Sequence, residues 1–142
     1  MQIEPAFEAF QPLHAAGQPQ VVWTTLVSDL ETPVSAYLKI AGAKTNAFLL
    51  ESVEGGAIKG RYSVLGMEPD LIWRCRGTVA EINRRPGADR NAFTPLPDAP
   101  LAELRKLLAD SRIDMPDRLP PMAAGVFGYL GYDMVRQMEH LP

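Results

Sequence analysis

Residues 46–66 constrain the fold more than any other stretch, because they hold two short apolar runs on either side of a glycine-rich turn. The first run predicts a strand over residues 47–53, and both of its faces are apolar at the start, which is typical of a central strand. Gly55-Gly56 permits a tight reversal. A second short strand is expected over residues 62–65. The stretch therefore predicts two neighbouring strands of one sheet.

Three more strands are expected elsewhere. Residues 21–27 are rich in β-branched side chains, and residues 70–76 and 78–84 predict a hairpin around Gly77. Residues 86–100 contain four prolines and predict a loop, because proline cannot donate a hydrogen bond inside a sheet.

Helix signals lie between these strands. Thr32 and Pro33 predict a helix start and Gly42 its stop. Asp98 is expected to cap a helix to about residue 111, and Asp133 a final helix. A helix near Phe7 should be ended or kinked by Pro12. The expected apolar faces are Val34, Tyr37, Leu38 and Ala41 in one helix, and Leu101, Leu104 and Leu108 in another.

These elements predict an α+β fold with a mainly antiparallel, sandwich-like sheet core and flanking helices. The 142 residues favour one domain. The chain stops at Pro142 without a closing strand, so we expect a fold truncated at its C-terminus. Apolar residues 125–132, interrupted by three glycines, are then expected to form an exposed face through which isolated chains self-associate.

Composition excludes several function classes. The net charge of −3 argues against nucleic acid or an anionic membrane as partner. No run approaches the ~20 apolar residues of a membrane helix, and the N-terminus carries no secretory signal. The single cysteine, Cys75, fits a reducing cytoplasm and is expected to be an inert core residue.

Familiar catalytic and metal sites are not supported by the sequence. His14 and His140 are far apart and lack nearby cysteines, so a zinc site is not expected. No phosphate-binding loop or nucleophile elbow occurs. Residues 55–61 resemble a phosphate cradle only superficially, and a hairpin turn is the favoured interpretation.

Glu51-Ser52 is the polar cluster that most resembles a ligand site. It follows the apolar run directly, and two interpretations stay open from the residues alone. Spacing favours a solvated strand end. The other interpretation is a site for a zwitterion, in which the Glu51 carboxylate pairs with an ammonium, Ser52 helps to bind a carboxylate, and Arg61 adds positive charge.

Several motifs, in the right order, resemble the large, chorismate-using subunit of anthranilate synthase (component I), in its N-terminal domain. The motifs are Thr32-Pro33-Val34, Leu49 to Gly56 (LLESVEGG), Gly60-Arg61-Tyr62-Ser63, Gly66 to Pro69, Ile72 to Gly77 and Gly125 to Asp133.

The resemblance implies a parent lyase that makes anthranilate from chorismate in the first step of tryptophan synthesis. The parent uses Mg²⁺ and ammonia from a glutamine amidotransferase subunit, component II. Its chorismate and Mg²⁺ residues lie in a C-terminal domain that residues 1–142 do not contain. No catalytic residue, no metal and no activity is therefore expected in this chain alone.

For residues 1–142 the resemblance implies a regulatory domain that gives half of a site for L-tryptophan, the feedback inhibitor. The residues carried over are Glu51 and Ser52, flanked by Leu50, with Arg61 following the turn. Two alternatives stay open: the corresponding domain of aminodeoxychorismate synthase component I, and a free-standing amino-acid-binding regulatory module.

Overall fold

The computed structural model describes residues 2–51, 62–120 and 122–139. The chain divides into two compact units. One contains Met1–Asp29 and Leu108–Gly128, and the other contains Leu30–Leu107 and Tyr129–Pro142. All named strands and the predicted site fall in the second unit.

The strands form two small antiparallel sheets within the described residues, which confirms the α+β class. One sheet pairs β1 (Phe48–Glu51) with β2 (Ser63–Gly66). The other has the order β3 (Ile72–Arg76), β4 (Val79–Asn83) and β5 (Thr94–Pro95). The predicted central position of the first strand is wrong, because β1 has a single strand neighbour in the described part of the chain.

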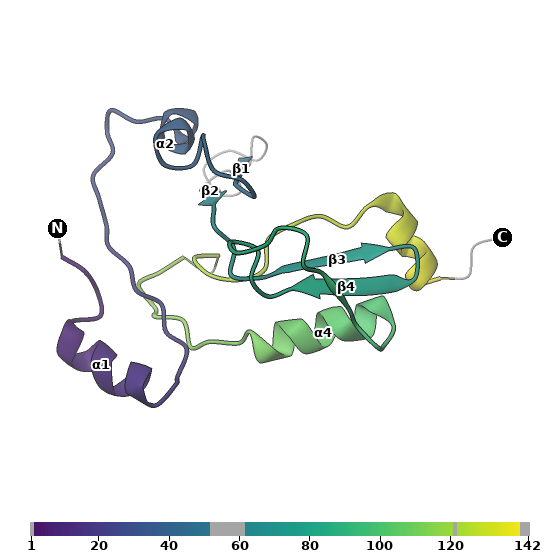
Figure 1. Cartoon of the computed structure of the whole chain (residues 1–142). Coiled ribbons are helices and arrows are strands. Elements are labelled where there is room, and N and C mark those ends of the chain that lie inside the picture. The colour runs from purple at the N-terminus through teal and green to yellow at the C-terminus, as the bar shows by residue number, and fades with distance from the viewer. Residues whose placement is uncertain (1, 52–61, 121, 140–142) are drawn as a thin grey trace. The chain divides into compact units, whose positions relative to one another are not determined.

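The hairpin predicted around Gly77 is confirmed (Figure 1). Arg76 pairs with Val79, so Gly77 and Thr78 alone form the loop. Gly77 has a φ of +58°, the left-handed conformation that glycine adopts without steric cost. The proline-rich segment is a loop except at β5, where Pro95 lies on an edge strand, a position that tolerates the missing N–H.

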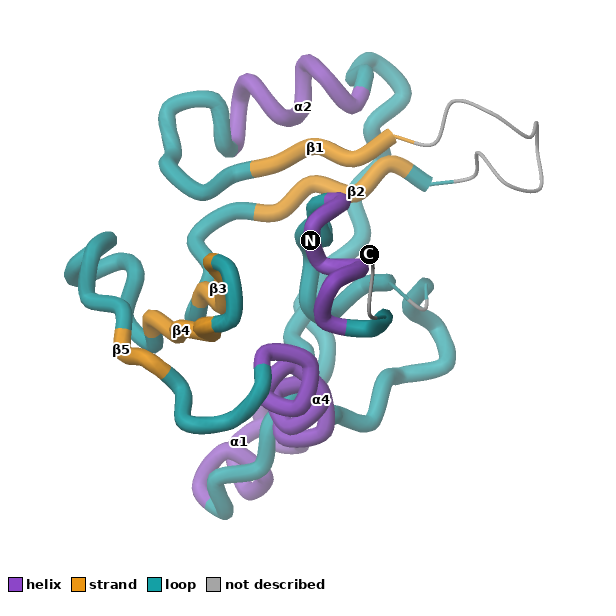
Figure 2. Tube along the Cα trace, turned by 90° about the vertical axis from the view of Figure 1, so that its right-hand side faces the viewer, coloured by secondary structure: helices purple, strands orange, loops and turns teal. Residues whose placement is uncertain are grey.

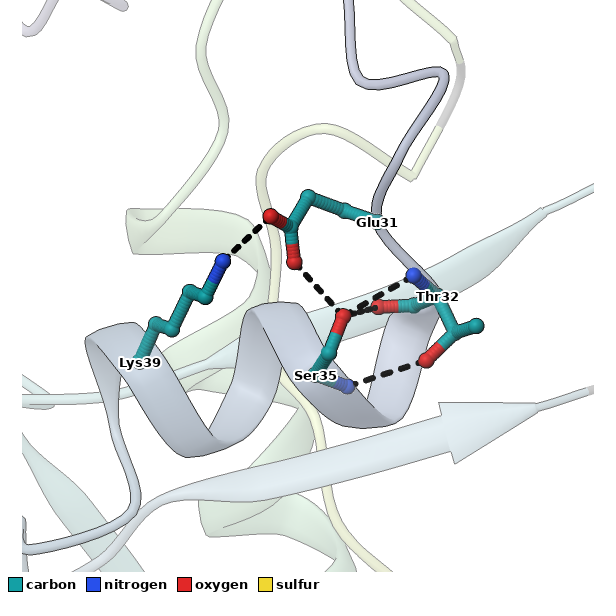
Figure 3. Close-up of polar contacts among 4 residues, drawn as sticks. All are labelled: Glu31, Thr32, Ser35 and Lys39. Atoms are coloured by element: carbon teal, nitrogen blue, oxygen red, sulfur yellow. Dashed lines mark hydrogen bonds and ion pairs between the residues drawn. The ribbon is translucent and has the colours of Figure 1, made fainter.

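Helix α2 (Pro33–Ile40) begins where the sequence predicts. The Thr32 hydroxyl accepts from the Ser35 amide at 3.1 Å, and the Ser35 hydroxyl accepts from the Thr32 amide at 2.9 Å. This reciprocal capping box satisfies two amides that a helix start leaves unpaired (Figure 3). Glu31 extends the cap by accepting from both Ser35 and Lys39. The helix packs against β1 and β2 and runs alongside them (Figure 2).

Helix α4 (Pro100–Asp110) is confirmed, but its predicted cap and face are wrong. Asp98 lies one residue too early to be the cap, and its backbone amide donates to the Glu103 carboxylate at 3.1 Å. That bond draws Glu103 inward, to 7% exposure. The buried helix residues are therefore Pro100, Glu103 and Leu107 and not the three predicted leucines.

Three other local predictions differ from the structure. The expected strand at residues 21–27 is absent from the described residues, where Trp23 instead forms an isolated bridge with Glu4 through two bonds of 2.8 Å. Helix α1 (Phe7–Ala15) does not end at Pro12, which stands inside it, and Glu8, whose carbonyl cannot bond the missing Pro12 amide, is exposed. The final helix is a 3-10 helix, η1 (Tyr132–Gln137), preceded by Gly131 and not by Asp133.

The fully buried apolar set is small among the described residues. Apart from the buried prolines Pro86 and Pro100, it consists of Ala41 after α2, Ala80 and Ile82 in β4, and Leu107 in α4, each at most 6% exposed. The face predicted for α2 is only partly covered, since Val34 is 51% and Leu38 66% exposed. Asn83 is 1% exposed, and its side chain donates to the Asp89 carbonyl at 2.7 Å and accepts from the Arg85 amide at 2.9 Å. This buried amide fixes the turn that follows β4.

Candidate functional site at the end of the β1–β2 hairpin

The predicted site begins where β1 ends. Residues of β1 and β2 pair in one continuous register, in which Leu49 lies opposite Leu65, Leu50 opposite Val64 and Glu51 opposite Ser63. Because successive residues of a strand point to opposite faces, Glu51 shares a face with Ser63 and Leu50 shares the other with Val64.

Leu50 and Glu51, two of the four predicted site residues, are thus the last two residues of β1, at the end of the hairpin away from the α2–β1 and β2–β3 loops. The Leu50 side chain is 49% exposed, and Glu51 and Ser63 are exposed. A carboxylate on a half-covered apolar strand end can pair with an ammonium while the neighbouring leucines contact an apolar group. Ser52 and Arg61 lie outside the described residues, so their roles stay predictions.

Phe48 and Gly66 hold this register. They are directly paired, and the Phe48 ring occupies the space over Gly66 that a side chain would fill. A Cβ on Gly66 would lie 2.3 Å from Phe48 Cε1 and 2.4 Å from Cζ, well inside any real contact. The glycine is therefore required for the ring position seen here, and sliding β2 by one residue would place Leu65 or Met67 under the ring instead.

Sequence reasoning did not predict that Ser63 lies opposite Glu51. The strand beginning near residue 62 was predicted, but the partner of each residue depends on the hairpin register. In hairpins the register follows from turn geometry and loop length, which a single sequence does not fix here. The Phe48–Gly66 pair is the signal that points to the register, and it is recognised only once the two strands are placed side by side.

A second polar feature of the same unit is an open pocket of about 460 Å³. Lys44 and Glu68, which line it, form an ion pair of 2.5 Å between the α2–β1 loop and the β2–β3 loop. Asn46 and Glu68, also in its lining, have φ values of +58° and +51°. The ion pair thus connects the α2–β1 loop with the β2–β3 loop at the end of the hairpin opposite Glu51.

Cys75 and possible metal ligands provide no further site. Burial raises the pKa of the Cys75 thiol, which keeps it protonated and weakly nucleophilic, as expected of an inert residue. Its Sγ donates to the Gly77 carbonyl at 3.3 Å. In the described ranges, no group of three or more histidine, cysteine or acidic side chains is arranged to hold a metal ion. No helix in the same ranges is long and apolar enough to cross a membrane.

Comparison with known proteins identifies relatives of this chain. No protein-family model matches it, and no solved structure matches it. Anthranilate synthase component 1 of Cereibacter sphaeroides is 59% identical over 137 residues, which are 96% of this chain and 27% of the relative. The proteins of that name from Synechocystis sp. and Thermus thermophilus are each 39% identical, over 96% and 83% of this chain and 26% and 23% of their own lengths.

The chain is thus related to the N-terminal part of a family of synthases, and it spans about a quarter of the length of these curated relatives. It belongs to the anthranilate synthase component 1 family, as the sequence motifs predict.

Proposed function

We propose that this chain is the N-terminal regulatory part of an anthranilate synthase large subunit. The parent enzyme would form anthranilate from chorismate and ammonia in tryptophan biosynthesis. The single observation that carries the proposal is the 59% identity to a protein of that name over 96% of the chain. The number in the relatives' name implies a second component, which we propose is the glutamine amidotransferase that supplies ammonia.

The chemistry of the parent is assigned to residues outside this chain. We propose that the Mg²⁺ and chorismate sites of the parent lie in the part of the protein beyond residues 1–142. Their proposed contribution is control of the parent's activity.

We propose that Leu50, Glu51, Ser52 and Arg61 form half of a feedback site for L-tryptophan. The exposed carboxylate of Glu51 supports this, because it ends an apolar strand and suits the ammonium of an amino acid. Tryptophan inhibits only if it binds the low-activity arrangement of the parent more tightly than the active one. A coupling of about 1–3 kcal/mol corresponds to roughly 5- to 150-fold, enough for substantial inhibition.

The test is made on the full-length protein that contains this chain. It should release anthranilate from chorismate and an ammonium salt, and tryptophan should inhibit that reaction. Ser52→Phe should keep the turnover and lose the inhibition, because the larger side chain fills the site. Release of aminodeoxychorismate instead would assign the chain to the related synthase. If the tryptophan concentration for half inhibition were the same in Ser52→Phe as in the wild type, the assignment of the site would be wrong.

Calorimetry on the 142-residue chain separates a half-site from an independent module. Weak or absent heat with tryptophan is expected, since half of the contacts are proposed to come from elsewhere. Tight binding to the chain alone would favour a free-standing amino-acid sensor.

A further inference from the structure

The turn that follows β4 carries three arginines, and residues 84–90 are called the basic turn below. Arg84, Arg85 and Arg90 are exposed, and no ion pair within the described residues includes any of them. The one carboxylate of the turn, that of Asp89, accepts from the Asn91 backbone amide at 2.8 Å. The basic turn therefore presents three guanidinium groups that are available to a partner.

Hydrogen bonds fix the backbone of the basic turn. The buried Asn83 side chain bonds the Arg85 amide at 2.9 Å and the Asp89 carbonyl at 2.7 Å. The Asp89 amide in turn donates to the Arg85 carbonyl at 3.1 Å. Because Arg90 follows Asp89 directly, these bonds hold all three arginines on one compact turn. A turn that is ordered beforehand loses little conformational entropy when it binds.

The unit that contains the N-terminus has a pocket of complementary character, with a volume of about 200 Å³. Its lining includes the apolar Leu108, Ile113, Met115 and Val126 and the polar Ser111 and Arg112. Asp110 and Asp114 each adjoin a lining residue in the chain and are exposed, and neither takes part in an ion pair with a described residue. The pocket with these two aspartates is called the acidic pocket below.

Asp110 lies where folding alone does not favour a carboxylate. It is the last residue of α4, and the last turn of that helix has no basic residue. The carbonyl end of a helix carries partial negative charge, so a carboxylate there is unfavourable. Residues that break a local rule of stability are expected at functional sites, which indicates a binding role for the acidic pocket.

We propose that the acidic pocket of one copy of this chain binds the basic turn of a second copy. An arginine side chain suits the pocket, because its apolar stem can lie against Leu108 and Met115 while its guanidinium pairs with a carboxylate. Arginine is also enriched in the contacts between protein chains. This inference does not depend on the proposed tryptophan site.

The charges of the two units support a second copy as the occupant. The unit with the acidic pocket, Met1–Asp29 with Leu108–Gly128, has a net charge of −4, from two basic and six acidic residues. The unit with the basic turn has a net charge of +1, from twelve basic and eleven acidic residues. Each copy thus offers one turn and one pocket, and a dimer with two-fold symmetry occupies both pairs at once.

The test measures self-association of the full-length protein by sedimentation velocity. The wild type should form dimers at about 0.01 M salt and dissociate towards ~1 M, because the screening length falls from about 30 Å to about 3 Å. Replacing the three arginines together, Arg84→Gln, Arg85→Gln and Arg90→Gln, should raise the dimer Kd at low salt about tenfold or more.

The matched control makes the same change of charge at three exposed arginines outside the basic turn and should leave the Kd within about twofold of the wild type. Its substitutions are Arg76→Gln, Arg105→Gln and Arg136→Gln. The thermal midpoint of every variant shows whether a loss of association is a loss of folding. Equal Kd values for the two triple variants would overturn the proposal.

Charge reversal tests the pairing itself. A protein with Arg84→Glu and Arg85→Glu should be monomeric, and so should a second protein with Asp110→Lys and Asp114→Lys, since each then opposes like charges. Their mixture should form a heterodimer, because both pairs of surfaces are complementary again. A mixture that stays monomeric would contradict the proposal. So would a wild type that is monomeric at low salt, or dimers that persist at ~1 M salt, as expected of a contact through the apolar residues 125–132.

Discussion

The ring of Phe48 lies over the backbone of Gly66, so closely that a Cβ there would come within 2.3 Å of ring atom Cε1. The relationship is mutual. The glycine admits the ring, and the ring covers a strand position that has no side chain of its own. The two residues therefore act as one packing unit, and their substitutions should not be independent.

Gly66→Ala should destabilise the chain by about 1–3 kcal/mol, because the added methyl group forces the Phe48 ring out of its position. Phe48→Leu should remove much of that penalty by withdrawing the ring atoms. The coupling between the two substitutions should reach about 0.5–3 kcal/mol in a double-mutant cycle from denaturant unfolding. Additive effects would contradict the packing described here.

Thr32→Ala should lower stability by about 1 kcal/mol, since the Ser35 amide loses its acceptor at the start of α2. Thr32→Ser keeps the hydroxyl and should remain within a few tenths of a kcal/mol of the wild type. The measurement is the midpoint of urea unfolding. Equal midpoints for the alanine and serine variants would show that the cap is unimportant.

Acid should weaken the same helix end. The hydrogen bonds from Lys39 and Ser35 hold the pKa of Glu31 below its ordinary value of 4.5. A carboxyl group whose pKa is lower in the folded state contributes stability above its unfolded pKa and loses it as pH falls through the folded pKa. Stability attributable to this group is therefore expected to be constant near pH 7 and to decline below about pH 4.5.

Glu31→Gln should flatten that decline, and so should Lys39→Gln, because each removes the ion pair. The check is the thermal midpoint of each variant across pH 3–7. If both variants kept the full acid sensitivity of the wild type, the pair would have no part in it.

Asn83→Ala should cost about 1–3 kcal/mol, since it removes the buried side-chain amide that bonds the Asp89 carbonyl and the Arg85 amide. Asn91→Ala removes the side chain of an exposed asparagine in the same turn and serves as its control, with an expected effect within 0.5 kcal/mol. Chemical denaturation of the two variants distinguishes them. Similar losses of stability in the two variants would mean that the burial of Asn83 does not contribute to stability.

Local signals predicted the elements that depend on neighbours in sequence. Thr32 and Pro33 located the start of α2 because a capping box is formed within four residues. Gly77 located the β3–β4 turn for the same reason. The α+β class and its antiparallel pairing followed from these short-range patterns.

Features that depend on distant partners could not be predicted in this way. Residues 21–27 have strand-forming side chains, yet a strand also needs a neighbour, and in the described chain Trp23 alone finds a bridge partner. The buried face of α4 was misplaced because Glu103 turns inward to accept from the Asp98 amide. For the candidate site, Leu50 and Glu51 were predicted from the sequence, whereas the position of Ser63 opposite Glu51 required the register.

The unit that contains the N-terminus is assembled from two segments far apart in the chain. Glu4 and Arg118 form an ion pair of 3.1 Å across a separation of 114 residues. During translation, Met1–Asp29 must therefore wait for Leu108–Gly128 before this unit can close. At about 5–20 residues per second the delay lasts several seconds, during which the hairpins of the other unit are already complete. The order of synthesis thus lets the hairpins form before the N-terminal segment meets its partner, while Tyr129–Pro142, the last part of the strand-bearing unit, is added only after both segments have been made.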